Sequence, residues 1–436
     1  MTHSPRFSHR PVTSTVVLLG ALALVTAGGC SPGERHPARD DAGRTALTFW
    51  NGFTGPDGVT MTHMVDEFQR ENPDVVVNMQ FIPWSTYYNK LTLSMAYGGE
   101  PDVFVVQSTH FAQYASCGVL RPLADAYASG ARPLTKVDFA AQPWQQSFYN
   151  GKQYGLPLDI WPMGLYYNAK LFRDAGIVDS HGNAKPPTTA EEFLVDAQKL
   201  TVIDPGQSQP RQWGFAFTDL HYNWLTIAEQ FGGGMVTADG RRGAMSSPGS
   251  LAATRLMCDM IGKYHVAPRP AQVNSWLLFR EGKIAMTIQG IYMLADLQKQ
   301  QGLEYAGAPV PTLGPVQSTM GGSHMLCEPA GASPERAKAA WRLMRFLTDH
   351  SYEWAAGGQV AARSDVLRSE PFAKLPVQSE FAREVTYVQY EPQVPKGPSL
   401  SQFVDPAIES CLDGLQSPED AMRDADRRID QLLSRD

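Results

Sequence analysis

The chain has 436 residues, of which 43 % are hydrophobic and 19 % charged, so it carries enough apolar material for real cores and is not wholly disordered. Its length exceeds what one ordinary core supports, and we expect two or more lobes. With 37 basic against 44 acidic residues, it lacks the basic excess that a nucleic-acid binder needs. Aromatic residues make up 10 %, which suits an apolar-faced ligand site as well as a core.

The N-terminal segment has the pattern of an export signal. Arg6 and Arg10 give it a positive start, and Val16–Ala27 is a run of 12 apolar or weakly polar residues. A membrane span needs about 20, so we predict a signal peptide over residues 1–29. The small residues that precede Cys30 resemble a bacterial lipobox, in which Cys30 would be lipidated. Ordinary signal cleavage beside an incidental cysteine is the alternative.

Residues 30–45 are rich in Pro, Gly and charge, and we expect them to form a flexible tether. No later stretch of sequence is long and apolar enough to span a membrane. We therefore expect a folded body that its lipid anchor holds at the outer face of the bacterial cytoplasmic membrane.

Four cysteines follow the tether: Cys117, Cys258, Cys327 and Cys411. In an oxidising compartment an even number allows two disulfides, in any of three connectivities. Their wide spacing suits isolated buried thiols equally well. No CxxC motif occurs, so nothing supports a zinc or redox site.

The first half of the body alternates short apolar strands with helical patterns. We predict strands at 46–50, 75–81 and 102–106, and helices around Met61–Phe68 and Leu91–Ala96 between them. The run at 102–106 is continuously apolar, which is typical of a buried strand in a parallel sheet. This alternation predicts an α/β doubly wound lobe.

A second lobe is predicted after Pro157. A strand at 165–168 leads into a helix over 169–175, and Thr188 or Thr189 caps the next helix, whose first turn holds Glu191 and Glu192. Two further helices are predicted over 250–264 and 337–348. The repeated strand–helix pattern indicates the same α/β class for this lobe.

Catalytic and cofactor motifs are missing from the sequence. It contains no GxSxG, HExxH, Walker loop or GxGxxG, and its histidines have no partners at ligand spacing. Acidic pairs such as Glu191–Glu192 lie at a helix start, where the helix dipole accounts for them. We therefore expect no enzyme, no cofactor and no metal.

Several short motifs, taken in order, resemble the extracellular solute-binding proteins of bacterial ABC importers, in the large sugar-binding family that includes the maltose-binding protein. Each motif alone is short, but together they cover nearly all of residues 46–370. The motifs are Tyr87–Leu91 with Gly98–Val103, Gly118–Leu123, Gly151–Pro157, Tyr166–Asn168 with Leu171–Ile177, Pro187–Phe193, Phe279–Gly290, Gly321–Ser323 and Ala340–Leu347.

The resemblance implies a two-lobed fold of the type II periplasmic-binding-protein kind, with the ligand in the cleft between two doubly wound α/β lobes joined by a hinge. Residues 46–156 plus 313–358 would form lobe 1, and residues 157–312 plus 359–436 would form lobe 2. Hinge segments are expected near 157–165 and 306–312. Ligand held between both lobes would stabilise their closed arrangement.

A sugar site needs aromatic plates for C–H faces and planar polar groups for hydroxyls, placed on loops at strand ends. Trp50, Gln107 and Ser108 lie at or after strand ends. Tyr87, Asp159, Trp161, Trp224, Gly290, Tyr292, Gly321 and Gly322 are candidates that the resemblance implies. For Trp50, Tyr87 and Asp159 a structural role is the alternative, and Arg363 could equally form a surface salt bridge. We assign Trp213, Trp341 and Trp354 to the core.

The resemblance implies a monomeric carbohydrate receptor that delivers a sugar or oligosaccharide to the transmembrane subunits of an ABC transporter. Three alternatives remain open: a ferric-ion binder using Tyr166–Tyr167, a receptor for a glycerol-phosphate ester, and a lipid-anchored glycosidase. The identity, linkage and length of the sugar depend on loop geometry.

Overall fold

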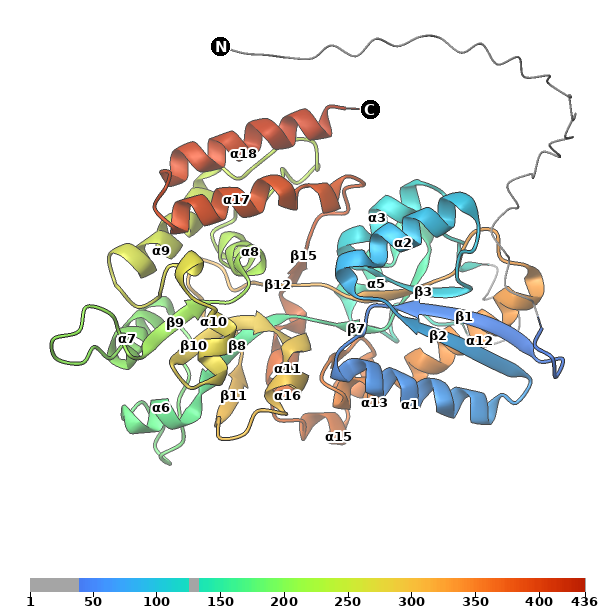
Figure 1. The fold of residues 1–436 in the computed structure, drawn as a ribbon, viewed down its shortest axis with the longest axis horizontal. Helices are drawn as coiled ribbons and strands as arrows, with labels where there is room; N and C mark the ends of the chain where they lie inside the picture. The colour runs from blue at the N-terminus through green and yellow to red at the C-terminus, as the bar shows by residue number, and fades with distance from the viewer. Residues whose placement is uncertain (1–38, 125–132, 436) are drawn as a thin grey trace, which may run out of the picture.

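The computed structural model describes residues 39–124 and 133–435. The predicted signal peptide, Cys30 and residues 31–38 of the predicted tether lie outside these ranges. Two lobes stand side by side, each built around its own sheet, with helices on the sheet faces (Figure 1). Within the described ranges, no helix combines the length and apolar character that crossing a bilayer requires.

The first lobe is built on a five-stranded sheet in the order β2-β1-β3-β13-β6. β1, β2 and β3 run parallel, whereas β13 is antiparallel to β3. The strands are β1 (Thr45–Asn51), β2 (Val75–Phe81), β3 (Val103–Gln107), β6 (Gly155–Pro157) and β13 (His324–Cys327). The helices are α1 (Pro56–Glu71), α2 (Trp84–Tyr97), α3 (Ser108–Ser116), α5 (Ala141–Gln146), α12 (Pro334–Asp349) and α13 (Ser351–Ala356), and a hairpin joins β4 (Phe148–Tyr149) to β5 (Lys152–Gln153).

The second lobe is built on a four-stranded sheet in the order β11-β8-β10-β9. The strands are β8 (Met163–Asn168), β9 (Trp213–Phe217), β10 (Ile284–Gly290) and β11 (Tyr305–Ala308). The helices are α6 (Ala169–Asp174), α7 (Ala190–Leu200), α8 (Leu220–Gln230), α9 (Pro248–Gly262), α10 (Ser275–Arg280), α11 (Leu294–Leu297), α17 (Ser401–Leu412) and α18 (Pro418–Leu433). The last two helices return to pack on α8 and α9 (Figure 1).

Three segments connect the lobes. The chain crosses first through β7 (Asp159–Ile160), which pairs with β14 (Val360–Ala361). It returns after β12 (Thr319–Gly321), which pairs with β15 (Val388–Tyr390). The third crossing runs from β14 to β15 through the short helices α14 (Ser364–Leu367), α15 (Glu370–Ala373) and α16 (Gln378–Ala382).

The sequence pattern predicts the two-lobed α/β class, and the structure confirms it. Both sheets are mixed rather than purely parallel, because β6 and β13 pair antiparallel in one and β8 does so in the other. β12 packs on α8 of the second lobe. The stretch around 319–321 therefore lies with the second lobe, although the sequence assigns 313–358 to the first, and the second crossing follows β12 rather than spanning 306–312.

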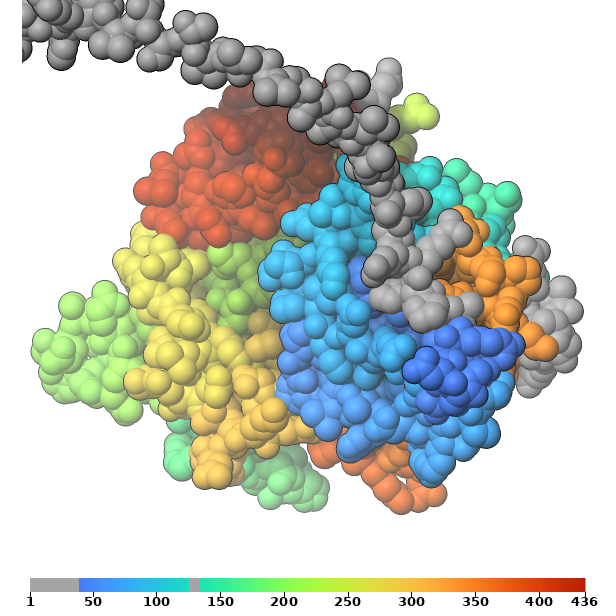
Figure 2. All heavy atoms as spheres, turned by 45° about the vertical axis from the view of Figure 1, so that its right-hand side comes forward, coloured from blue at the N-terminus to red at the C-terminus, as the bar shows by residue number. Residues whose placement is uncertain are grey.

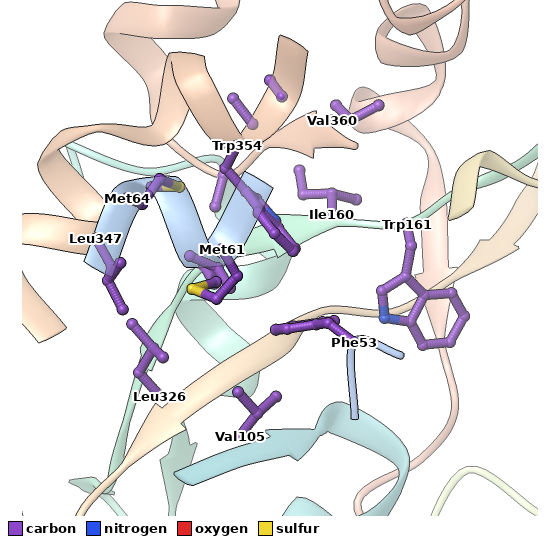
Figure 3. Close-up of a cluster of buried hydrophobic side chains, with 14 of the residues drawn as sticks. Phe53, Met61, Met64, Val105, Ile160, Trp161, Leu326, Leu347, Trp354 and Val360 are labelled. Atoms are coloured by element: carbon purple, nitrogen blue, oxygen red, sulfur yellow. The ribbon is translucent and has the colours of Figure 1, made fainter. Parts of the chain in front are cut away.

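A large buried hydrophobic cluster spans the first lobe and the crossing segments and continues into the second lobe, where it includes Tyr166, Ala216 and Ile284. The helical spacing of Met61 and Met64 on α1 presents both side chains to the sheet, which agrees with the predicted helix. Figure 3 shows Phe53 and Trp354 inside this cluster, with Trp161 at its edge. The cluster thus packs against side chains that face the space between the lobes, among them Trp84, Tyr222 and Tyr292.

All four cysteines of the body are free thiols in this structure. Cys327 is buried, whereas Cys117 is exposed. Cys258 and Cys411 come near each other, since the Cys258 thiol donates to the Cys411 carbonyl oxygen at 3.5 Å. The sequence leaves open either two disulfides or isolated thiols, and in this structure the four thiols are unpaired.

Candidate functional site

A cavity of about 330 Å³ lies between the lobes. Figure 2 shows the lobes in contact, with blue atoms of the first lobe against yellow and orange atoms of the second. The walls of the cavity come from three sources: the first lobe, the first crossing segment and the second lobe. The lining residues are Gly52, Thr54, Gly55, Pro56, Asp57, Trp84, Gln107, Trp161, Tyr222, Tyr292, Met293, Asp296, His324 and Gln359. This position matches the expected interlobe cleft.

Three of the aromatic rings that line the cavity are each seated against a glycine. A Cβ on Gly52 would lie 2.2 Å from the Trp84 indole. A Cβ on Gly290 would lie 2.0 Å from the Tyr292 ring, and one on Gly322 would lie 2.0 Å from the Trp161 indole. Real Cβ atoms do not approach so closely, so glycine at these places makes the room that the rings occupy.

The wall between Trp84 and Trp161 is held by a buried polar cluster. Asp159 is fully buried, and its carboxylate accepts from the His324 ring Nδ1 at 2.7 Å, the His324 backbone N–H at 2.9 Å and Trp354 Nε1 at 2.8 Å. The His324 ring then stacks on Trp84, with centroids 5.6 Å apart. Asp159 therefore orients an aromatic wall of the cavity from behind.

Carboxylates stand at two further points of the lining. Asp57 lies in the first turn of α1, after Pro56, where the helix dipole favours an acid. Burial raises the pKa of Asp57, against the opposing attraction of His324. Asp296 of α11 accepts from Trp276 Nε1 at 2.9 Å.

Behind the Tyr292 ring, its hydroxyl donates to Asp219 Oδ2 at 3.2 Å. Asp219 is also the N-cap of α8, and its side chain accepts from the Tyr222 backbone N–H. Burial raises the pKa of Asp219, while the Tyr222 N–H lowers it. One carboxylate thus fixes the tyrosines at 222 and 292 relative to each other.

Two buried polar atoms of the lining residues have no hydrogen-bond partner among the residues that the structure describes. They are the indole Nε1 of Trp161 and the side-chain Oε1 of Gln359. Both residues are 2 % exposed. An unpaired buried donor or acceptor costs about 1–3 kcal/mol, and a polar ligand in the cavity could supply the missing partners.

The structure brings three of the sequence-predicted site residues to the cavity wall: Gln107, Trp161 and Tyr292. Four others stand directly behind that wall. Gly290 and Gly322 seat the rings, Gly321 packs against the backbone of Trp161, and Asp159 holds His324. Ser108 is buried beside them, where its Oγ accepts from the Ser323 N–H at 3.2 Å.

Four predicted residues lie away from the cavity lining. Tyr87 is buried in the first lobe, where its hydroxyl donates to the carbonyl oxygens of Val105 (2.7 Å) and Trp50 (3.2 Å). Trp50 itself is 4 % exposed. Trp224 is buried in the second lobe and donates to Thr254 Oγ1 at 2.8 Å.

Arg363 is the fourth of these residues, and its guanidinium pairs with Asp365 at 2.8 Å and Asp349 at 3.3 Å. These ion pairs correspond to the salt bridge that the sequence leaves open for Arg363. Of the tryptophans assigned to the core, Trp341 and Trp354 are buried, and Trp213 is partly buried against the core.

Sequence reasoning missed eleven of the fourteen lining residues, among them Asp57, Trp84, Tyr222, Asp296, His324 and Gln359. Tyr222 and Trp224 are two positions apart on α8, and such residues do not share a helix face. The resemblance implies Trp224, but Tyr222 is the residue that lines the cavity. The Asp219 N-cap signal, which fixes where α8 begins, could have favoured Tyr222.

Among the described residues, no group of three or more His, Cys, Asp or Glu side chains is arranged to hold a metal ion. Tyr166 and Tyr167 are successive residues of β8, so their side chains point to opposite faces of the sheet. Accordingly, Tyr166 belongs to the first hydrophobic cluster and Tyr167 to the second. This pair is therefore not placed to chelate one ferric ion.

Comparisons with known proteins agree with this architecture. The family of bacterial extracellular solute-binding proteins matches residues 54–354. A binding protein of Brucella abortus (strain 2308) is 25 % identical over 424 residues, covering 91 % of this chain and 94 % of that protein. The maltotriose-binding protein of Pyrococcus abyssi is 22 % identical over 383 residues, covering 85 % and 78 %.

Among solved structures, the substrate-binding protein Lmo0181 of Listeria monocytogenes, in complex with cycloalternan, has the same fold. It superposes with a TM-score of 0.77 at 22 % identity, covering 90 % of this chain and 100 % of that one. With the family match spanning most of the folded body, the chain belongs to the bacterial extracellular solute-binding proteins.

Proposed function

We propose that this protein is the carbohydrate receptor of an ABC importer and binds a sugar or short oligosaccharide in the cavity between its lobes. The observation that carries the proposal is the cavity itself, where aromatic rings packed against glycines line the same space as two residues with a buried polar atom that has no partner in the described part of the chain. Aromatic faces pack on sugar C–H surfaces, and the unpaired atoms match hydroxyl groups.

The relatives support this ligand class. The proteins from Pyrococcus abyssi and Listeria monocytogenes are described with maltotriose and cycloalternan. A glycerol-phosphate ester fits less well, because no Lys or Arg is among the described residues that line the cavity, and phosphate recognition relies on such cations. The family consists of binding proteins, and we propose that this chain also performs no chemistry on its ligand.

We further propose that residues 1–29 are a signal peptide, that Cys30 is lipidated, and that the monomeric receptor passes its ligand to transmembrane permease subunits. We also propose that each lobe consists of one of the two sheets together with the helices that pack on it. Membrane fractionation of the Cys30→Ser variant tests the anchor. The variant should become soluble, and its continued tight membrane association would contradict lipidation.

A thermal-shift screen against neutral mono- and oligosaccharides, with both α and β linkages, tests the function. A ligand that binds only the native state raises the unfolding midpoint. The Tyr292→Ala variant should lose about 2 kcal/mol of binding, as buried aromatic anchors do, with little change in the midpoint without ligand. If no saccharide raises the wild-type midpoint, the proposed function is wrong.

Trp224→Ala serves as the matched aromatic control. Because Trp224 is fully buried in the second-lobe core, its truncation should cost about 3–5 kcal/mol of stability. Tyr292→Phe, which keeps the ring and loses only the bond to Asp219, should retain most of the affinity. Full binding by Tyr292→Ala would remove Tyr292 from the site.

A further inference from the structure

The charges around the cavity do not balance. Asp296 has a counter-charge, since Arg280 Nη1 lies 3.5 Å from its carboxylate. The His324 ring is hydrogen-bonded to Asp159, with Nδ1 2.7 Å from Oδ2. Asp57 has no ion pair within residues 39–124 and 133–435, and its carboxylate accepts only backbone N–H groups there, such as that of Gly58 at 2.9 Å.

Burial raises the pKa of Asp57, and the opposing attraction of His324 offsets this cost only in part. A ligand that brings a positive charge would relieve this cost. Asp57 and Gln359 both line the cavity, and the buried Oε1 of Gln359 has no hydrogen-bond partner within residues 39–124 and 133–435. An ammonium group has three donors and no acceptor, so it matches a pair of acceptors.

The aromatic lining of the cavity also favours a positively charged ligand. Trp84, Trp161, Tyr222 and Tyr292 present rings to the cavity, and a cation over the face of Trp or Tyr is attracted by the ring quadrupole. No Lys or Arg side chain from the described part of the chain lines this space to repel such a group. The Asp57 carboxylate, the Gln359 oxygen and the aromatic rings therefore all favour a positively charged group on the ligand.

We propose that the ligand is an amine-bearing saccharide whose ammonium group binds at Asp57 and Gln359, while its ring packs on the aromatic walls. This inference rests on the proposed function and narrows it to cationic sugars. The cavity of about 330 Å³ lies near the lower end of the range for small-molecule sites, about 300–1,000 Å³. We therefore expect one or two sugar rings.

Calorimetry with matched ligands tests the inference. The first set is glucosamine, glucose and N-acetylglucosamine, and the second is their β-1,4-linked disaccharides, so that only the substituent at C2 differs within a set. At pH 6, where the amine is protonated, at least one amine ligand should bind about tenfold or more tightly than its neutral counterparts. Raising the pH until the amine is neutral should remove this preference.

Asp57→Asn should reduce the ratio of amine to neutral affinity to about one. Asp66→Asn is the matched control, because Asp66 lies on the same helix but is exposed, and its ratio should stay at the wild-type value. Choline tests whether a cation without a sugar ring suffices. Tight choline binding without binding of the amine saccharides would overturn the saccharide half of the inference.

Failure of the inference and failure of the proposed function give different results. If a neutral saccharide binds as tightly as its amine counterpart, the protein remains a sugar receptor and the cationic preference is wrong. The cationic preference is also wrong if Asp57→Asn keeps the wild-type ratio of amine to neutral affinity. If no saccharide of the broad screen or the matched sets binds, the cationic preference and the proposed function as a sugar receptor are both wrong.

Discussion

Single glycines decide where the aromatic walls of the cavity stand. Gly322 is the clearest case, because a methyl group there would occupy the position of the Trp161 indole at 2.0 Å. The indole cannot retreat freely, since Trp161 is 2 % exposed and its backbone N–H donates to the Gly322 carbonyl oxygen at 2.9 Å. The residue that builds the wall and the residue that makes room for it are thus directly bonded.

We predict that Gly322→Ala weakens saccharide binding about tenfold or more, because the indole must turn out of its place on the wall. Calorimetry measures the affinity, and tryptophan fluorescence reports the changed surroundings of the indole. Gly331→Ala is the control, since a Cβ there meets only Glu100 Oε1 at an ordinary 3.6 Å. Wild-type affinity in Gly322→Ala would show that the position of Trp161 does not matter for binding.

At the scale of elements, a partly buried histidine joins α8 to the C-terminal part of the second lobe. His221 Nδ1 lies 2.6 Å from Asp405 of α17, and its Nε2 lies 3.7 Å from Glu391, just after β15. Burial lowers the pKa of His221, but hydrogen bonds with the two acids outweigh it and raise the pKa to about 10. The imidazolium form is therefore the stabilising one.

Since the folded pKa lies above the ordinary value near 6.5, this stabilisation is fully present below about pH 6.5 and is lost as the pH rises through about 10. We predict that His221→Gln lowers the free energy of unfolding by about 2 kcal/mol at pH 6. The difference from wild type should shrink toward pH 10. Urea unfolding at both pH values measures it.

His63→Gln, at an exposed position on α1, is the control and should not differ from wild type at either pH. If the cost of His221→Gln is the same at pH 6 and pH 10, the charge on His221 does not hold these elements together.

The elements themselves could be predicted well from the sequence, whereas the cavity wall could be predicted only in part. Val75–Phe81 and the helix capped by Thr189 have strong local signals, and the structure contains both. Gln107 is predictable because it follows a predicted strand, whereas Tyr292 is a candidate that the family resemblance implies. Trp84 begins a helix that reads as an ordinary core helix, and only the folded chain shows that its ring stacks on His324, 240 residues later.

At the scale of the whole molecule, the site exists only where the lobes meet. Asp57 and Trp84 come from the first lobe, Tyr222 and Tyr292 come from the second, and Trp161 lies on a crossing segment. A ligand that contacts all three parts makes its full set of contacts only when the lobes are together. Its binding free energy therefore favours the closed arrangement by the difference in contacts between the two states.

We predict that the saccharide found in the screen makes the protein more compact in solution. Small-angle scattering should give a smaller radius of gyration at saturation than without ligand, because bridging contacts draw a population of more open molecules toward the closed state. Gly322→Ala, measured at the same ligand concentration, should show a smaller change in proportion to its lost affinity. An unchanged wild-type radius at saturation, with binding established by calorimetry, would mean that the lobes are already held together without ligand. The three crossing segments would then act as fixed struts rather than hinges, and the receptor would present the same shape to its transporter whether empty or loaded.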